Sequence, residues 1–221
     1  MTTHVVSGHT ARGVGPAPKA LLWDLGGVFL DWDPRYLYRK LFGGDLAARE
    51  EFLANVTTPA WHAEQDLGRS VVEACAALAA EHPAQAPLIL AWGQRSEEMI
   101  GGVIQGSVEL LGELRALRVR QYALSNMEPE NWEKRRRAYE FLSWFDGYFI
   151  SGLERVAKPD PRYFELALSR FGLAPGEALF VDDREVNVRV AEALGVPALL
   201  FSGPEALRAE LVARGFPVAR P

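Results

Sequence analysis

The sequence lacks most features that would tie a chain to an oxidising compartment, a membrane or a nucleic acid. It has a single cysteine, Cys75, which cannot form a disulfide within the chain. No stretch approaches the roughly 20 apolar residues that a membrane-spanning helix needs. The formal net charge is −5, and the basic run at residues 134–137 lies in a helical pattern that predicts a solvated helix face. These absences predict a cytoplasmic protein that binds neither a membrane nor a nucleic acid.

What the sequence does contain divides its 221 residues into three parts. Residues 1–18 are rich in Gly, Thr, Pro and Ala and lack the apolar core of a signal peptide, which predicts a flexible leader. Residues 34–105 follow helical patterns broken at Gly and Pro, which predicts a small inserted helical domain. Residues 19–33 and 106–221 alternate short apolar runs with amphipathic helices. This pattern predicts an α/β fold, in which a Rossmann-like parallel sheet has helices on both faces and carries the α-helical insert.

The core pattern predicts strands at residues 20–23, 119–124, 148–150, 178–181 and 197–201. In sheets of this kind, ligands bind outside the carboxyl ends of the strands. The polar residues that follow the apolar runs are therefore the candidates for chemistry. They are Asp24, Ser125, Asn126, Lys158, Asp182 and Asp183.

Three of these candidates, Asp24, Asp182 and Asp183, are carboxylates that follow buried strands. Neighbouring buried carboxylates raise the cost of each other's ionisation unless a cation compensates. Oxygen ligands without Cys or His nearby favour Mg²⁺, which a few carboxylates hold together with substrate phosphate and water. A helix cap would account for Asp183 alone, but it does not explain the whole trio. The trio therefore predicts a magnesium site.

The other candidates carry complementary chemistry for phosphate. Lys158 supplies a point charge that neutralises a carboxylate and a phosphate together. Ser125 and Asn126 end a strand ahead of a helix, so a hydroxyl and adjacent backbone N–H groups can hold phosphate oxygens. Taken singly, these residues would be an exposed lysine and two turn residues. Beside three carboxylates they predict phosphoryl transfer.

Four segments, in this chain order, resemble the motifs of the haloacid dehalogenase superfamily. They are Asp24–Val28, Leu124–Asn126, Ala157–Pro161, and Phe180–Arg184 with Asn187. Each motif is weak alone, but four in the right order are specific. The resemblance points to the phosphatase-like branch, and the stretch between the first two motifs is similar to that superfamily's small helical (C1-type) cap.

The resemblance implies a mechanism and a ligand set. Asp24 attacks phosphorus and forms an aspartyl-phosphate, which water hydrolyses. The phosphoryl group is bound by Gly27, Ser125, Asn126 and Lys158. Mg²⁺ is held by Asp24, the Gly26 carbonyl, Asp182 and Asp183. The implied protein is a phosphoric monoester hydrolase whose partner is a small phosphorylated metabolite, with the oligomeric state left open.

Two other interpretations fit the pattern less well. Some members of the superfamily cleave carbon–halogen bonds without metal, but they usually have uncharged residues in place of the acidic pair Asp182 and Asp183. Receiver domains of response regulators also combine acids, a hydroxyl and a lysine on a parallel sheet. Their acidic pair lies near the N-terminal strand, which is the opposite order to the one found here.

The sequence departs from the superfamily's pattern at Gly26. Most phosphatases of the superfamily have a second Asp there, which protonates the leaving group and activates water, a contribution of about 10² to 10⁴ in rate. One explanation is a good leaving group such as an anomeric sugar phosphate, because phosphatases resembling a glucose-1-phosphate phosphatase share the Asp-Leu-Gly opening. A second is another acid. A third is a catalytically weak or inactive phosphate-binding or regulatory protein.

Candidates for another acid lie just after the first motif and in the insert. Asp31 and Asp33 are two, although Asp33 is equally placed to cap the helix that follows it. His62 groups with Asp66 and Arg69 around a turn of the insert, where cap residues of the superfamily contact the leaving group. Arg69 is a candidate for binding a second anionic group. The sequence thus predicts a Mg²⁺-dependent hydrolase of a small phosphate monoester, with a sugar phosphate as one candidate.

Overall fold

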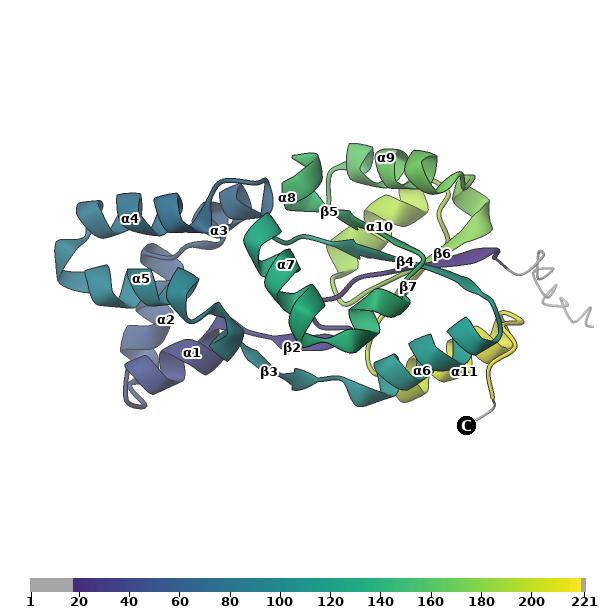
Figure 1. The fold of residues 1–221 in the computed structure, drawn as a ribbon, viewed down its shortest axis with the longest axis horizontal. Coiled ribbons are helices and arrows are strands. Elements are labelled where there is room, and N and C mark those ends of the chain that lie inside the picture. Colours follow the sequence, from purple (N-terminus) through teal and green to yellow (C-terminus); the bar gives the residue numbers. More distant parts are fainter. Residues whose placement is uncertain (1–17, 220–221) are drawn as a thin grey trace, which may run out of the picture.

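The computed structural model describes residues 18–219, and at its centre is a five-stranded sheet (Figure 1). All neighbouring strands run parallel, in the order β5-β4-β1-β6-β7. The strands are β1 (Ala20–Trp23), β4 (Arg120–Ser125), β5 (Gly147–Ile150), β6 (Ala178–Asp182) and β7 (Ala198–Leu200). Because the chain builds outward from β1 in both directions, β1 lies where such sheets bind ligands. The predicted α/β fold class is confirmed.

Both faces of the sheet are covered because β1 is apolar along its whole length. Its residues are fully buried and alternate between the faces, with Leu21 and Trp23 on one side and Ala20 and Leu22 on the other. One face carries α6 (Gln105–Ala116) and α11 (Pro204–Ala213), and the other carries α9 (Pro161–Phe171) and α10 (Glu185–Ala193). The sheet therefore lies between two layers of helices.

A second group of helices lies beside the sheet in Figure 1 and has its own hydrophobic cluster. The helices are α1 (Pro34–Leu41), α2 (Leu46–Asn55), α3 (Pro59–Asp66), α4 (Val71–Glu81) and α5 (Ala86–Gln94). Tyr38 and Trp92 are buried in this cluster, with ring centroids 6.2 Å apart. Because these apolar side chains pack among themselves, the helices form a separate hydrophobic unit.

Two short strands that the sequence did not predict join this insert to the core. β2 (Leu30–Trp32) pairs antiparallel with β3 (Ile100–Val103). Strand β3 lies inside residues 34–105, which the sequence analysis assigned to helices. The two glycines of β3 interrupt the alternation of apolar and polar side chains that would predict a strand. The pairing forms because the chain enters the insert after β2 and leaves it through β3 at the same place.

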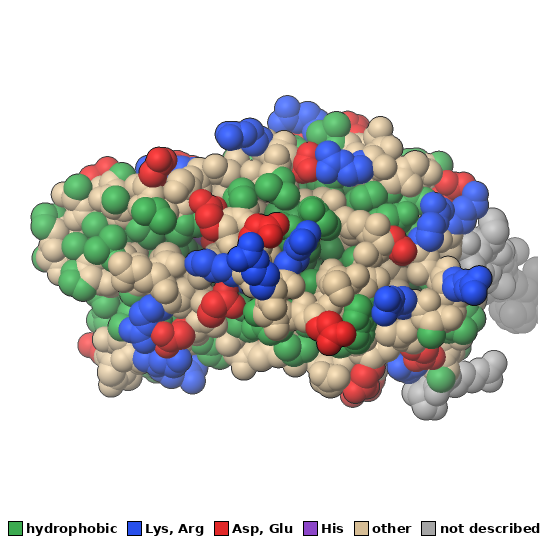
Figure 2. All heavy atoms as spheres, viewed as in Figure 1, with side chains coloured by type: hydrophobic (Ala, Val, Ile, Leu, Met, Phe, Trp, Pro, Cys, Tyr) green, Lys and Arg blue, Asp and Glu red, His purple; other side chains and the backbone are tan. Residues whose placement is uncertain are grey.

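The core is completed by α7 (Pro129–Ala138) and the short α8 (Ser151–Glu154). Lys134, Arg136 and Arg137 of α7 are exposed, and Figure 2 shows Lys and Arg side chains gathered over this helix beside acidic ones. Arg135, in the same basic run, is buried. The predicted solvated face therefore describes the run except at Arg135.

Two predictions can be compared with the structure only over the described residues. The flexible leader predicted for residues 1–18 lies outside them, apart from Pro18. Among residues 18–219, no helix combines the length and the apolar character that crossing a bilayer requires.

Candidate active site

The candidate site lies where the carboxyl ends of the central strands meet. In the parallel register, Trp23 of β1 lies opposite Val181 of β6. The next residues, Asp24 and Asp182, are therefore neighbours, and the backbone N–H of Asp24 donates to the Val181 carbonyl at 2.8 Å. Asp183 follows directly, and the three side chains each offer a carboxylate oxygen within 4.8 Å of the others. Sheet register thus assembles the predicted carboxylate trio.

Lys158 lies between two of these carboxylates. Its Nζ donates hydrogen bonds of 2.7 Å to Oδ1 of Asp24 and to Oδ2 of Asp182, and one of 3.0 Å to the Leu124 carbonyl. Its side chain is only 1% exposed. Burial by itself would lower the pKa of Lys158, but the two carboxylates raise it above its usual value. The lysine therefore stays charged between the acids.

The acids carry more negative charge than Lys158 balances. Burial raises the pKa of Asp24 to about 7, with Lys158 opposing the rise and Asp182 adding to it. Burial, followed by the charge of Asp182, also raises the pKa of Asp183. A set of oxygen donors that is partly buried and has excess negative charge fits a hard divalent cation. The donor chemistry therefore fits Mg²⁺.

The two members of the acidic pair are held differently. Asp182 is fully buried and accepts hydrogen bonds from Asn187, whose Nδ2 lies 2.9 and 3.0 Å from its two oxygens. It also accepts one from the backbone N–H of Arg184 at 2.8 Å. Asp183 is exposed and lines the cavity described below. Asp182 is therefore anchored by the protein, whereas Asp183 presents its oxygens to a ligand.

The paired glycines of the first motif have different environments. Gly27 has φ +73°, and a Cβ there would lie 2.2 Å from Oδ2 of Asp183. Only glycine suits this left-handed backbone and this close approach. At Gly26, by contrast, no atom beyond Gly26 and its two chain neighbours lies within 4 Å of the position that a Cβ would take. There is open space where the resemblance expects a second Asp.

Ser125 and Asn126 face different partners. The side chain of Asn126 pairs with both backbone groups of Lys158: its Nδ2 donates to the carbonyl at 2.8 Å, and its Oδ1 accepts from the N–H at 2.9 Å. The side chain of Asn126 thus positions Lys158, and Asn126 also lines the cavity. Ser125 lines the cavity, and its Oγ makes only a long 3.5 Å contact with the Asn126 carbonyl. The hydroxyl therefore remains available to a phosphate oxygen.

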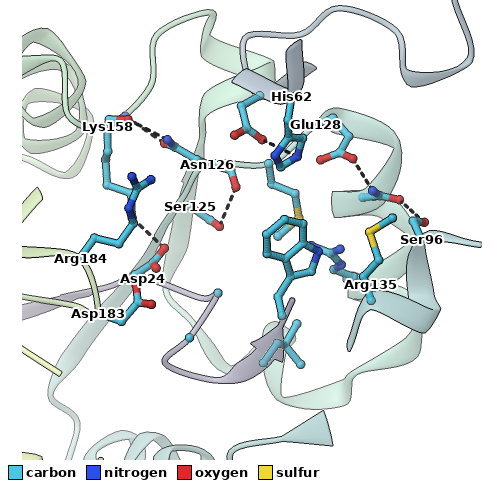
Figure 3. Close-up of a pocket in the computed structure, with 18 of the residues that line it drawn as sticks. Asp24, His62, Ser96, Ser125, Asn126, Glu128, Arg135, Lys158, Asp183 and Arg184 are labelled. Atoms are coloured by element: carbon cyan, nitrogen blue, oxygen red, sulfur yellow. Dashed lines mark hydrogen bonds and ion pairs between the residues drawn. The ribbon is translucent and has the colours of Figure 1, made fainter. Parts of the chain in front are cut away.

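A cavity of about 420 Å³ opens in front of Asp24 and is lined by both the core and the insert (Figure 3). The motif residues on its lining are Asp24, Gly26, Gly27, Ser125, Asn126, Lys158, Asp183, Arg184 and Asn187. Further residues on its lining are Trp32, His62, Asp66, Trp92, Met99, Met127, Glu128, Asn131 and Arg135. Because this second set is both apolar and charged, the cavity can hold an organic group larger than phosphate.

Asp31, Asp33 and His62 were predicted as acids for the leaving group and Arg69 as a group that binds a second anion. Of these four, only His62 lines the cavity. Asp31 accepts a hydrogen bond of 2.6 Å from the Tyr36 hydroxyl. Asp33 caps α1, because its carboxylate accepts a hydrogen bond of 2.8 Å from a backbone N–H in the first turn. Arg69 forms an ion pair with a glutamate of α3. The structure brings His62 to the site and leaves the other three off the cavity lining.

His62 lies against the aromatic part of the cavity. Its ring stacks on Trp32 at a centroid distance of 5.3 Å and meets Trp92 edge-on at 5.1 Å. Its Nε2 is 3.8 Å from Oδ1 of Asp66, one helical turn away on α3. Burial raises the pKa of Asp66 to about 6, although the neighbouring His62 opposes the rise. A buried carboxyl group with a raised pKa therefore lies beside an imidazole.

Three residues that were not predicted from the sequence line the cavity from α7 and the residue before it: Glu128, Asn131 and Arg135. Their spacing of three and four residues puts them on one face of a helix. Asn131 accepts a hydrogen bond of 3.0 Å from the Ser96 hydroxyl and donates one to Glu128. This spacing, directly after the second motif, was the available signal. Periodicity shows that residues share a face of a helix, but it does not show which part of the protein or which cavity that face lies against.

A family model described as haloacid dehalogenase-like hydrolase matches residues 18–195. Acyl-CoA dehydrogenase family member 10 of Mus musculus is 45% identical over 75 residues, which are 34% of this chain and 7% of that protein. A sesquiterpene phosphatase of Aspergillus oryzae is 34% identical over 90 residues, which are 41% of this chain and 46% of that protein. The chain thus spans less than half the length of these curated relatives.

A solved structure adds a likeness over most of the fold. It is an enzyme of the haloacid dehalogenase family from Bacteroides thetaiotaomicron, in complex with magnesium and inorganic phosphate. The TM-score is 0.65 at 23% identity, and the match covers 84% of this chain and 95% of that one. At this identity the likeness concerns the fold.

Proposed function

The chain belongs to the haloacid dehalogenase-like hydrolases, and from that membership we propose that it hydrolyses small phosphate monoesters with Asp24 as nucleophile and Mg²⁺ as cofactor. One observation carries the proposal. Nζ of Lys158 donates hydrogen bonds to both Asp24 and Asp182 beside a cavity, and a carboxylate oxygen of Asp183 lies within 4.8 Å of oxygens of both acids. The names of the Aspergillus phosphatase and of the magnesium and phosphate complex support the same chemistry. A screen of phosphate esters that measures released phosphate, with Asp24→Asn as the control, tests it.

In this proposal Asp24 attacks phosphorus in line and forms an aspartyl-phosphate as the alcohol departs. Its Oδ1 accepts the hydrogen bond from Lys158, which leaves Oδ2 for the attack. The attacking carboxylate must be ionised, and the charge of Lys158 favours that form against the effect of burial. Water then attacks the phosphorus of the aspartyl-phosphate and restores the Asp24 carboxylate.

The phosphate oxygens are assigned to Lys158, the Ser125 hydroxyl and the backbone of the Gly26–Gly27 loop. These groups act by placing positive charge and hydrogen-bond donors where negative charge develops. The two hydrogen bonds between Asn126 and the backbone of Lys158 support this assignment, because they hold the lysine in place before substrate arrives. The partner is a small phosphorylated metabolite.

The residues suited to hold Mg²⁺ are Asp24, the Gly26 carbonyl, Asp182 and Asp183. When bound, the ion would neutralise phosphate charge and help orient the ester. Asp183 is the ligand that this chain leaves most open, because Asp182 already accepts hydrogen bonds from Lys158, Asn187 and a backbone N–H.

Removal of divalent ions is expected to abolish turnover, and added Mg²⁺ to restore it. Asp183→Asn should raise the Mg²⁺ concentration for half-maximal activity by about tenfold or more, because it removes a charged ligand. Glu185→Gln is the matched control, since this exposed glutamate pairs with Arg189 away from the cavity lining. A Mg²⁺ titration of phosphate release measures both. Phosphate release that survives chelation would contradict the metal assignment.

We also propose that the helical insert acts as a cap and that His62 protonates the leaving alcohol. The cavity is lined by both the insert and the core, so a leaving group bound in front of Asp24 meets Trp32, His62 and Trp92. Asp66, 3.8 Å from His62, can stabilise the charged imidazole.

Gly26→Asp is expected to raise turnover of esters with poor leaving groups by about 10², because it adds the side-chain acid. The open space around the Gly26 Cβ position accommodates it. An ester with a good leaving group, such as p-nitrophenyl phosphate, should gain little. Gly26→Asn is the control of equal size without the acid. Equal rates for the two variants on alkyl phosphates would show that leaving-group protonation does not limit the enzyme.

Gly26 also favours a second candidate, a phosphate-binding or regulatory protein without turnover. Such a protein would bind phosphate esters at Lys158 but would release no phosphate beyond the level of its Asp24→Asn variant. The ester screen therefore separates the two candidates.

A further inference from the structure

Arg135 is a buried cation that forms no ion pair with any acid in residues 18–219. Only 6% of the residue is exposed, and its Nε is buried without a hydrogen-bond partner among the described residues. The other buried cations, Arg49 and Lys158, form ion pairs with carboxylates. The charge of Arg135 reaches the nearby Asp66 carboxyl without forming an ion pair with it. The guanidinium group of Arg135 is therefore a buried donor group that a ligand in the cavity can use.

The position of Arg135 shows where that partner would lie. Its neighbours Lys134, Arg136 and Arg137 face solvent, whereas Arg135 lines the cavity. In Figure 3 its guanidinium group points into the pocket from the side away from Asp24. The inward turn of this one side chain separates it from the solvated basic face of α7.

The acidic side chains near Arg135 on the cavity lining already have partners. Glu128 accepts a hydrogen bond from Asn131. Asp66 lies beside His62, and burial raises the pKa of Asp66 to about 6, whereas the charges of His62 and Arg135 oppose the rise. Within residues 18–219 neither acid forms an ion pair with Arg135. The guanidinium therefore keeps donors for an anion in the cavity.

We propose that Arg135 binds a second anionic group, a carboxylate or a phosphate, on the leaving alcohol of the substrate. The inference rests on the proposed function, because it takes Asp24 and Lys158 as the site of the phosphoryl group. The cavity of about 420 Å³ is lined by both Asp24 and Arg135, so a small diacidic ester can reach both. A guanidinium group matches carboxylate and phosphate oxygens with two parallel donors. The substrate class is small phosphate esters with a second acidic group.

The test compares 3-phosphoglycerate with glycerol 3-phosphate, which has a hydroxymethyl group in place of the carboxylate. A second pair, fructose 1,6-bisphosphate and fructose 6-phosphate, differs by a phosphate, so the two pairs distinguish the two anions. Phosphate release gives kcat/KM for each ester, and calorimetry on the Asp24→Asn protein gives affinities without turnover. The second acid should raise kcat/KM and affinity by about tenfold or more in at least one pair.

Arg135→Gln should reduce this preference to about twofold or less, because the charge-assisted hydrogen bonds are lost. Arg137→Gln, on the exposed side of α7, should retain it. Because the preference is the ratio of two kcat/KM values measured on the same protein, a loss of folded protein lowers both values equally and leaves the ratio unchanged. If the ratio of kcat/KM values within each ester pair is the same in Arg135→Gln as in the wild type, the inference is overturned. It is also overturned if the wild-type protein hydrolyses p-nitrophenyl phosphate through Asp24 but shows no preference for the esters with a second acid. If no ester is hydrolysed in a way that depends on Asp24, the proposed function is wrong. The ratio of calorimetric affinities for the esters with and without the second acid then tests the role of Arg135 on its own.

Discussion

Replacement of Asp24 by asparagine is expected to lower kcat for every phosphate ester by about 10⁴ or more. An amide is a poor nucleophile and cannot form the aspartyl-phosphate. The fold should persist, because Lys158 keeps its ion pair with Asp182 and the amide oxygen still accepts its hydrogen bond. Released phosphate measured over long incubations gives the residual rate, and calorimetry shows whether the esters still bind.

The matched control is Asp33→Asn. Asp33 carries the same functional group nine residues along the chain, but it caps α1 and does not line the cavity. Asparagine serves equally well as a helix cap, so this variant should keep both its stability and its activity. If Asp24→Asn retained the wild-type rate, the carboxylate of Asp24 would not be the nucleophile.

Lys158→Met is expected to abolish activity and also to destabilise the fold. The substitution leaves Asp24 and Asp182 buried without their shared cation, and breaking a buried ion pair in this way costs about 3 to 5 kcal/mol. Urea unfolding at constant pH measures this free energy. Lys19→Met is the control, because Lys19 pairs with Glu177 at an exposed place and its loss should leave stability unchanged.

The pH dependence of the Lys158→Met defect has a defined sign. Without the lysine, the pKa of Asp24 rises above its present value of about 7, while the unfolded-state value stays near 3.8. A raised folded-state pKa stabilises the fold at low pH, and this stability is lost as the pH rises through the folded pKa. The defect should therefore be smaller at pH 5 than at pH 8. In the double variant Asp24→Asn, Lys158→Met, part of the stability at pH 8 should return. A defect that does not vary with pH would mean that packing, rather than charge, causes it.

The motif residues could be predicted from the sequence because their signals are local. Asp24, Ser125 and Asp182 each end or follow a short apolar run, and parallel strands bring their carboxyl ends to one edge. Strand β3 and the role of Asn126 could not be predicted in this way. β3 exists only through its pairing with β2, and the Asn126 amide meets the backbone of Lys158 across two separate loops.

By itself, the sequence determined the sheet, the acidic trio and its lysine, because burial and strand alternation follow from the order of apolar residues. Only the tertiary structure decided which polar side chains share the cavity. It retained His62, left Asp31, Asp33 and Arg69 off the lining, and turned Arg135 inward from a run of otherwise solvated residues. The reason is physical: the direction of a side chain across a cavity depends on how the insert and α7 pack against the core, and these contacts join segments far apart in the chain.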